Sequence, residues 1–69
     1  MKQKYPIVEK SASIRDALKI IDSFGKRICY VIENSKLVGV LTDGDIRRSL
    51  LKGSSISDIV EPIMNRDFV

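Results

Sequence analysis

The sequence predicts a small α+β domain, ordered β-α-β-β-α, in which a three-stranded sheet carries two helices on one face. Three observations predict this fold. Apolar residues recur at helical spacing after Ser13, and two short apolar runs, Ile28–Ile32 and Leu37–Leu41, are separated by four polar residues. A second helical stretch follows at once and ends near Leu51. The 69 residues, 43% of them hydrophobic and 30% charged, suit one folded domain.

The first strand and the first helix are predicted from local signals. Ile7 and Val8 follow Pro6 and are expected to form a short edge strand, where proline is tolerated. Ser13 and Asp16 have the spacing of a capping box, in which the hydroxyl accepts from an early helical N–H. Gly25 stands where a left-handed helix stop is expected. The apolar positions in between have helical spacing: Ile14, Ala17, Leu18, Ile21 and Phe24.

The two apolar runs are expected to form a β-hairpin. Glu33-Asn34-Ser35-Lys36 supplies the turn between Ile28–Ile32 and Leu37–Leu41. Neither run alternates apolar and polar residues, so both faces of these strands need cover. One helix and one hairpin do not provide that cover. We therefore expect a homodimer or a larger oligomer, with like copies side by side about a two-fold axis.

The second helix is expected to start at Thr42 or Asp43 and to run through Leu51, with Gly53 just beyond its end. Its apolar residues Ile46, Leu50 and Leu51 are expected on one side. A polar loop should follow over residues 54–58, and a short turn or helical fragment over residues 59–64. Phe68 and Val69 have the pattern of the first residues of another strand.

Charge and residue usage exclude several function classes. The net charge of +3 is small, and the longest basic runs are the pairs Lys26-Arg27 and Arg47-Arg48, so a nucleic-acid partner is not expected. The acidic residues Asp43 and Asp45 beside the second pair would repel phosphates of a nucleic acid backbone.

The sequence also argues against an enzyme, a metal centre and a membrane protein. Histidine is absent and Cys29 is the single cysteine, placed in an apolar run that favours a buried structural thiol. No paired nucleophile and base is visible. No apolar run approaches the ~18 residues of a membrane span, and the first residues are followed by no hydrophobic segment that resembles a signal peptide. We expect a cytoplasmic, non-catalytic protein without a cofactor.

The residues with chemical potential lie where the second apolar run meets the second helix. Thr42 brings a hydroxyl, the helix start brings unpaired N–H groups, and Asp45 brings a carboxylate three residues on. The hydroxyl and the N–H groups suit a phosphate, whereas an ionised carboxylate can accept from both hydroxyls of a ribose. Gly39 leaves room where a base could press against the strand.

A purely structural interpretation explains the same residues. Thr42 and Asp45 also form the pattern of an ordinary capping box, which opens many helices. Arg47 and Arg48 could assist a phosphate, but an arginine pair on a helix is more often solvated. The spacing alone leaves both interpretations open.

A resemblance to a known family bears on this choice. The stretch from Leu37 to Arg48 resembles the signature end of a CBS domain, and the helix and strand before it fall where that family has them. The run Thr42 to Arg48, with Leu51-Lys52-Gly53 and Ile63-Met64-Asn65, is most similar to CBS pairs attached to sugar-phosphate nucleotidyltransferases. A similar run occurs in CBS pairs of sugar-phosphate isomerases. By this resemblance, residues 1–62 form one CBS repeat, and residues 63–69 form a linker and the start of a second repeat.

The resemblance also implies a function and a set of binding residues. It implies a regulatory module that binds AMP, ADP, ATP or S-adenosylmethionine between paired repeats and controls an attached or partner enzyme. Thr42 would contact phosphate and Asp45 would hold the ribose. Val40 and Ile28 would flank the base, and the backbone near Arg27 would lie close to it. The alternative is a dimerisation or interaction module that binds no ligand.

Overall fold

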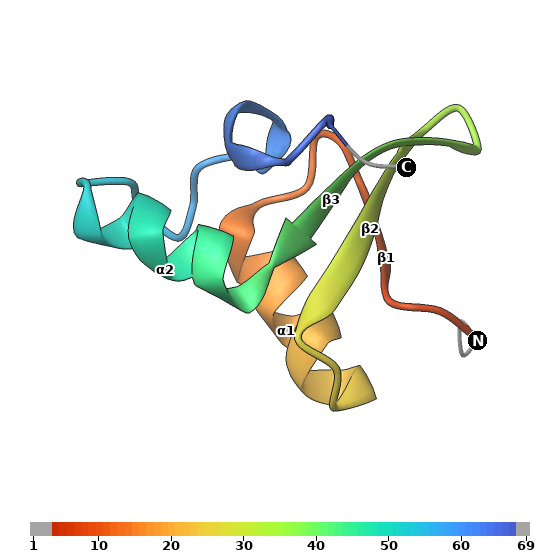
Figure 1. Ribbon diagram of the computed structural model, residues 1–69, viewed down its shortest axis with the longest axis horizontal. Helices are drawn as coiled ribbons and strands as arrows, with labels where there is room; N and C mark the ends of the chain where they lie inside the picture. Colours follow the sequence, from red (N-terminus) through yellow and green to blue (C-terminus); the bar gives the residue numbers. More distant parts are fainter. Residues whose placement is uncertain (1–3, 68–69) are drawn as a thin grey trace.

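The computed structural model describes residues 4–67. Within these residues the chain forms three strands, two α-helices and one 3-10 helix in the predicted order (Figure 1). Their bounds in chain order are β1 Ile7–Glu9, α1 Ile14–Phe24, β2 Ile28–Glu33, β3 Lys36–Thr42, α2 Asp43–Leu51 and η1 Glu61–Ile63.

The strands form one mixed sheet in the order β1-β2-β3. Strand β1 runs parallel to β2, with Ile7 opposite Tyr30, and β3 runs antiparallel to β2, with Cys29 opposite Leu41. A parallel pair cannot be joined by a tight turn, so the chain needs a crossover between β1 and β2. Helix α1 provides this crossover.

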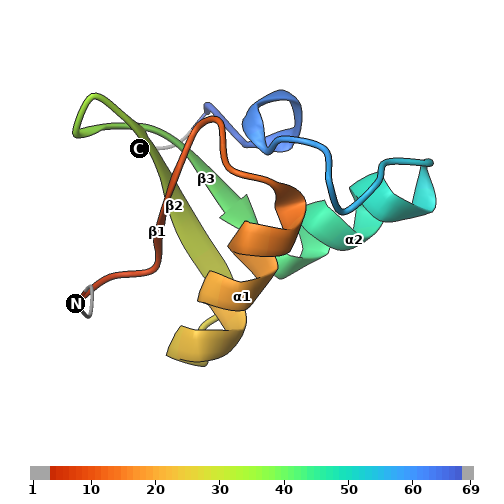
Figure 2. The ribbon, with the colours of Figure 1, turned by 180° about the vertical axis from the view of Figure 1, so that it is seen from behind.

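Both helices pack on the same face of the sheet, as the sequence predicts (Figures 1 and 2). Alternate strand residues point toward the helices and are buried, including Val8 on β1, Val31 on β2 and Leu41 on β3. They meet Ile14 and Ile46 from the two helices in one core. The expected fold class is therefore confirmed.

The first turn of α1 is held by its own cap and by a distant segment. Ser13 Oγ accepts from the Asp16 amide at 3.1 Å, and Gly25 ends the helix with φ of 66°. The backbone carbonyl of Asp58 accepts from the Ile14 amide at 2.8 Å. The carbonyl of Ile56 accepts from the Arg15 amide at 2.9 Å. The segment after α2 thus satisfies helix N–H groups that would otherwise lack partners.

The hairpin turn is tighter than the sequence predicts. Strand β2 continues to Glu33 and β3 begins at Lys36, so only Asn34 and Ser35 form the loop. Both loop residues have positive φ, 52° and 65°, which is the pattern of a type I′ turn. This turn is favoured because its twist matches that of the strands, and it pairs Glu33 with Lys36 instead of leaving them in the loop.

Helix α2 has the predicted bounds, but one apolar residue does not face the core. Ile46 is buried and Leu50 is partly buried, whereas Leu51 is 82% exposed. Successive residues are about 100° apart around a helix, so Leu51 lies about 140° from Ile46. The expectation that all three share one side is wrong for Leu51. Ser49, three residues after Ile46, takes the buried position instead.

The other face of the sheet is not covered by the helices. Tyr30 and Leu37 are exposed there, and Ile28, Ile32 and Val40 are only partly buried. We call these five residues, together with Ile7, the open sheet face. The need for cover on both faces, expected from the non-alternating runs, is thus unmet within the described residues.

The segment after η1 returns to the outer edge of β3. The Asn65 amide donates to the Val40 carbonyl at 2.8 Å, and the Val40 amide donates to the Asn65 carbonyl at 3.0 Å. The expected short helical fragment is confirmed as η1. The strand start expected at Phe68 and Val69 lies outside the described residues.

Candidate functional site

The candidate site lies at the junction of β3 and α2, where Thr42 and Asp45 form a complete capping box. Thr42 Oγ1 accepts from the Asp45 amide at 3.1 Å, and Asp45 Oδ2 accepts from the Thr42 amide at 3.1 Å. Both side chains are partly buried. The reciprocal pair fixes the hydroxyl and the carboxylate side by side at the helix start.

The second carboxylate oxygen of Asp45 is held by Arg48. Arg48 Nη2 donates to Asp45 Oδ1 at 2.6 Å, and the exposed fractions of the two side chains are 66% for Arg48 and 25% for Asp45. Burial acts to raise the pKa of Asp45. The hydrogen bonds with Thr42 and Arg48 and the positive charge of Arg48 outweigh this, so its pKa lies below the usual value. Asp45 is therefore ionised at neutral pH and can accept hydrogen bonds only.

Three more of the predicted binding residues lie beside this pair. Ile28 is directly opposite Thr42 in the β2–β3 ladder, and Val40 lies two residues before Thr42 on the same face. The Arg27 carbonyl accepts from the Asp43 amide at 3.0 Å, which joins the start of β2 to the start of α2. The structure thus brings together the hydroxyl, the carboxylate, two apolar side chains and the Arg27 backbone.

Gly39 lies apart from this group, on the face of the sheet that carries the helices. It is buried and pairs with Val31, and a Cβ atom there would lie 2.7 Å from Met64 Sδ. Side-chain packing of Met64 therefore explains why no side chain stands at this position. A role for Gly39 in making room for a base stays a prediction.

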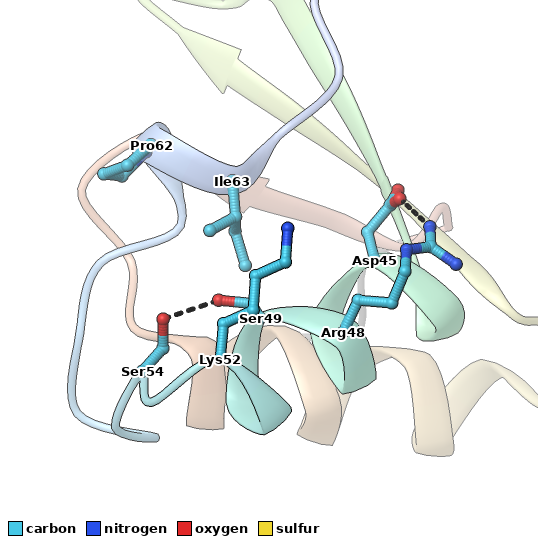
Figure 3. A pocket seen from close by; sticks show the side chains of 7 residues that line it. All are labelled: Asp45, Arg48, Ser49, Lys52, Ser54, Pro62 and Ile63. Carbon is cyan, nitrogen blue, oxygen red and sulfur yellow. Dashed lines mark hydrogen bonds and ion pairs between the residues drawn. The ribbon is translucent and has the colours of Figure 1, made fainter.

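A cavity of about 370 Å³ extends from Asp45 along α2 and below η1 (Figure 3). Three of its lining residues lie in α2, one directly follows α2, one lies in the next loop and two lie in η1. These seven residues are Asp45, Arg48, Ser49, Lys52, Ser54, Pro62 and Ile63. The charged side chains in this lining are the cations of Arg48 and Lys52 and the anion of Asp45. The sequence carries no local signal for this cavity, because η1 approaches α2 only in the folded chain.

Two serines form a polar contact in the wall of this cavity. Ser49 Oγ donates to Ser54 Oγ at 2.7 Å, and the Ser54 amide donates to the Ser49 carbonyl at 3.1 Å (Figure 3). Ser49 is buried although it is polar. The hydrogen bond satisfies its hydroxyl, so Ser49 is a structural residue that fixes the chain after α2.

Outside the junction, Cys29 supplies the single thiol of the sequence. Cys29 is fully buried, and burial raises the pKa of its thiol to about 11, so it is a protonated core side chain at neutral pH. In residues 4–67, no three His, Cys, Asp or Glu side chains come together in a way that could hold a metal ion. No helix in the same range is long and apolar enough to cross a membrane.

Comparison with known proteins decides the family. The family model described as the CBS domain matches residues 1–52, which is most of the chain and includes the β3–α2 junction. This chain belongs to the CBS domain family. The resemblance drawn from the run Leu37 to Arg48 is thereby confirmed.

The relatives of this CBS domain are longer proteins. An uncharacterised protein from Helicobacter pylori (strain J99) is 46% identical over 59 residues, which is 81% of this chain and 17% of the relative. A probable arabinose 5-phosphate isomerase from Haemophilus influenzae is 34% identical over 50 residues, 72% of this chain and 15% of the relative. The chain thus spans a fifth or less of the curated relatives it matches.

Solved structures share the fold of this CBS domain. A conserved uncharacterised protein from Pyrococcus horikoshii has a TM-score of 0.83 and 31% identity over 100% of this chain and 54% of its own. A cystathionine β-synthase domain protein fused to a Zn-ribbon-like domain has a TM-score of 0.82 and 26% identity, over 91% of this chain and 93% of its own.

A further similar structure is that of a CBS domain protein from Pyrobaculum aerophilum, which is complexed with AMP. It has a TM-score of 0.83 and 17% identity, over 96% of this chain and 53% of its own. At this level of identity the likeness concerns the fold.

Proposed function

We propose that this CBS domain is a regulatory module that binds an adenosyl ligand at the β3–α2 junction. Thr42 donates to a phosphate and Asp45 accepts from the ribose hydroxyls, while Val40 and Ile28 flank the base and the Arg27 backbone lies near it. The observation that carries the proposal is the convergence of these groups at one junction, with the hydroxyl and carboxylate fixed by reciprocal hydrogen bonds of 3.1 Å.

The capping box and the proposed binding are compatible. Thr42 Oγ1 acts as an acceptor in the capping box, and a hydroxyl in that role still has its own hydrogen to donate to a phosphate. Asp45 uses Oδ2 for the cap, and a carboxylate has about four acceptor positions in total. A ligand can therefore use both side chains without opening the helix start.

Membership of the family supports a regulatory role, since CBS domain proteins are generally regulatory and not catalytic. The AMP complex of the Pyrobaculum aerophilum protein supports the ligand class at the level of the fold. We extend the proposal to AMP, ADP, ATP or S-adenosylmethionine as the set of candidate ligands, and to action in the cytoplasm.

The regulated protein is proposed to be an attached or partner enzyme that acts on sugar phosphates. The similarity to the probable arabinose 5-phosphate isomerase supports the substrate class. A sugar-phosphate nucleotidyltransferase, favoured by the run Thr42 to Arg48, remains our proposal for the enzyme itself.

A second candidate function is an interaction module without a ligand. The open sheet face favours it, because Tyr30 is 36% exposed and Leu37 is 46% exposed beside partly buried aliphatic residues. A face of this kind suits contact with a second copy of the chain. Homodimer formation fits both candidate functions, so only a binding measurement separates them.

Isothermal titration calorimetry of the 69-residue chain with AMP and adenosine tests the proposal. Asp45→Ala should weaken binding of both ligands by about ten- to a hundredfold, because it removes hydrogen bonds to a charged acceptor. Thr42→Val keeps the shape of the side chain but removes the hydroxyl. It should therefore reduce the affinity for AMP more than that for adenosine.

Asp43→Ala is the matched control. Asp43 is also a carboxylate in the first turn of α2, but its ion pair is with Arg47, at 2.8 Å, on the helix exterior. This variant should bind AMP no more weakly than the parent does. If Asp45→Ala binds AMP normally while folded by circular dichroism, the site is wrong. If the parent dimer binds no adenosyl ligand, the interaction module is the better account.

A further inference from the structure

The side chain of Arg48 reaches back across the first turn of α2 toward the proposed phosphate position. A Cβ atom placed on Gly44 would lie 3.3 Å from Arg48 Nη1 and 3.8 Å from Thr42 Oγ1. The guanidinium and the Thr42 hydroxyl therefore both lie beside Gly44. The absence of a side chain at Gly44 leaves the space between them free.

Arg48 also compensates the local negative charge. Asp43 and Asp45 both stand in the first turn of α2, where a phosphate is proposed to bind, and their charges oppose that of a phosphate. The Arg48 side chain is 66% exposed, and its guanidinium donates to Asp45 Oδ1 through Nη2. It has further N–H groups that can donate to an anion while this ion pair persists.

The neighbouring cavity also favours an anion, because its lining carries two positive charges and one negative charge. Arg48 and Lys52 are four residues apart, so they lie on one side of α2, and both line the cavity that begins at Asp45 (Figure 3). Arg47, by contrast, is paired with Asp43 and is absent from the lining of this cavity. The two adjacent arginines thus have different surroundings.

We propose that Arg48 is the residue that selects a phosphate-bearing nucleotide over uncharged or cationic adenosyl ligands at this site. The proposal rests on the proposed function and narrows its ligand class. In the free protein Arg48 pairs with Asp45, and in the complex its free N–H groups donate to the phosphate beside Thr42. S-adenosylmethionine brings a sulfonium cation to the same place and is disfavoured by Arg48 and Lys52.

The test compares AMP, adenosine and S-adenosylmethionine by calorimetry on the parent chain and on Arg48→Gln. The parent should bind AMP more tightly than the other two. Arg48→Gln removes the charge and should weaken AMP about tenfold, with no loss of adenosine affinity, because adenosine has no phosphate and Asp45 is released from its ion pair. Arg47→Gln is the matched control and should leave the AMP-to-adenosine ratio within about twofold.

A second variant tests the geometry without removing the charge. Gly44→Ala adds a methyl group 3.3 Å from Arg48 Nη1 and 3.8 Å from Thr42 Oγ1, so it occupies the space between them and the guanidinium must give by a few tenths of an ångström. Gly44 is helical and is not among the glycines with positive φ, so alanine fits the backbone and helix formation is not impaired. We expect a loss of AMP affinity, smaller than that of Arg48→Gln, and unchanged adenosine binding.

The outcomes separate this proposal from the one it rests on. If Arg48→Gln binds AMP like the parent, or loses AMP and adenosine equally, Arg48 does not select the phosphate, although the binding site itself stands. The same holds if the parent prefers S-adenosylmethionine. If the parent binds none of the three ligands, the proposed function fails and the selection by Arg48 fails with it.

Discussion

At the scale of single residues, Asp45 has two roles that act on different observables. It caps α2 through Thr42 and pairs with Arg48, and both contacts favour its ionised form over the protonated one. Both contacts concern stability and its pH dependence, whereas the acceptor positions that they leave free are proposed to bind a ligand. Stability and binding must therefore be measured together in every variant of this residue.

Asp45 should make the stability of the fold depend on pH in the acid range. Its pKa is lower in the folded chain than the value of about 3.9 expected when unfolded. Its contribution is therefore present above about pH 4 and is lost as the pH falls through the folded-state pKa. Asp45→Asn removes a negative charge from the first turn of α2 and should cost about 0.3–1 kcal/mol at pH 7 and progressively less toward pH 3, measured by urea unfolding. An equal cost at both values would contradict the ionised cap.

The residues of the junction could be predicted from sequence, but their surroundings could not. Thr42 and Asp45 are three positions apart, so local geometry alone brings them together. Gly39 and Met64 are 25 positions apart, and no local pattern indicates that the methionine fills the space above the glycine. The position of the Arg48 guanidinium beside Gly44 has no sequence signal for a different reason, since it depends on the rotamer of a long side chain.

At the scale of elements, the contact of Gly39 with Met64 ties β3 to the segment after η1. Gly39→Ala places a methyl group 2.7 Å from Met64 Sδ and should cost about 1–3 kcal/mol of stability by overpacking. Met64→Ala should cost about 2–5 kcal/mol by leaving a cavity. The double variant should be less destabilised than the sum of the two, as measured by thermal unfolding. Simple additivity would show that the two residues do not share this space.

The hairpin turn offers a stabilising substitution. Ser35 has φ of 65°, a conformation that costs energy for a residue with a side chain. Ser35→Gly gives the Asn-Gly pair that type I′ turns favour and should stabilise the fold by about 0.5–1 kcal/mol. The expected rise in Tm is a few degrees in calorimetry. A lower Tm would argue against the two-residue turn.

Helices and strands were predictable because periodicity and caps are local, and in the hairpin the strand ends differ from the expected ones by only one residue each. The placement of Leu51 failed because a side of a helix is set by angles of about 100° per residue and not by closeness in sequence. The carbonyls of residues 56 and 58 accept hydrogen bonds from the first amides of α1. These hydrogen bonds were not predictable, because every residue has the same backbone carbonyl and the sequence gives no signal for its partner.

At the scale of the whole molecule, the open sheet face is the main reason to expect that the chain forms a homodimer. Burying one large apolar side chain contributes about 1.5–3 kcal/mol, which is considerable for a domain of marginal stability. Tyr30 lies at the centre of this face, between Ile7 on β1 and Val40 on β3. A second copy of the chain packed there would provide the cover that the helices do not give.

Sedimentation velocity at micromolar concentrations should show a homodimer that Tyr30→Asp dissociates, since a charge in an apolar contact remains unpaired. Leu51→Asp is the control, because Leu51 is 82% exposed on α2, away from the sheet. A parent that stays monomeric at high micromolar concentration would contradict the homodimer. Dissociation by Leu51→Asp alone would place the contact on the helices.

The central claim is that an adenosyl ligand binds at the β3–α2 junction, and a titration of ¹⁵N-labelled chain with AMP tests it most directly. Amide resonances of residues 42–48, Ile28 and Val40 should shift together with one dissociation constant. Those of Asn34 and Ser35, in the hairpin turn away from the junction, should stay in place. Shifts confined to other parts of the fold, or no shifts at millimolar AMP, would contradict the claim.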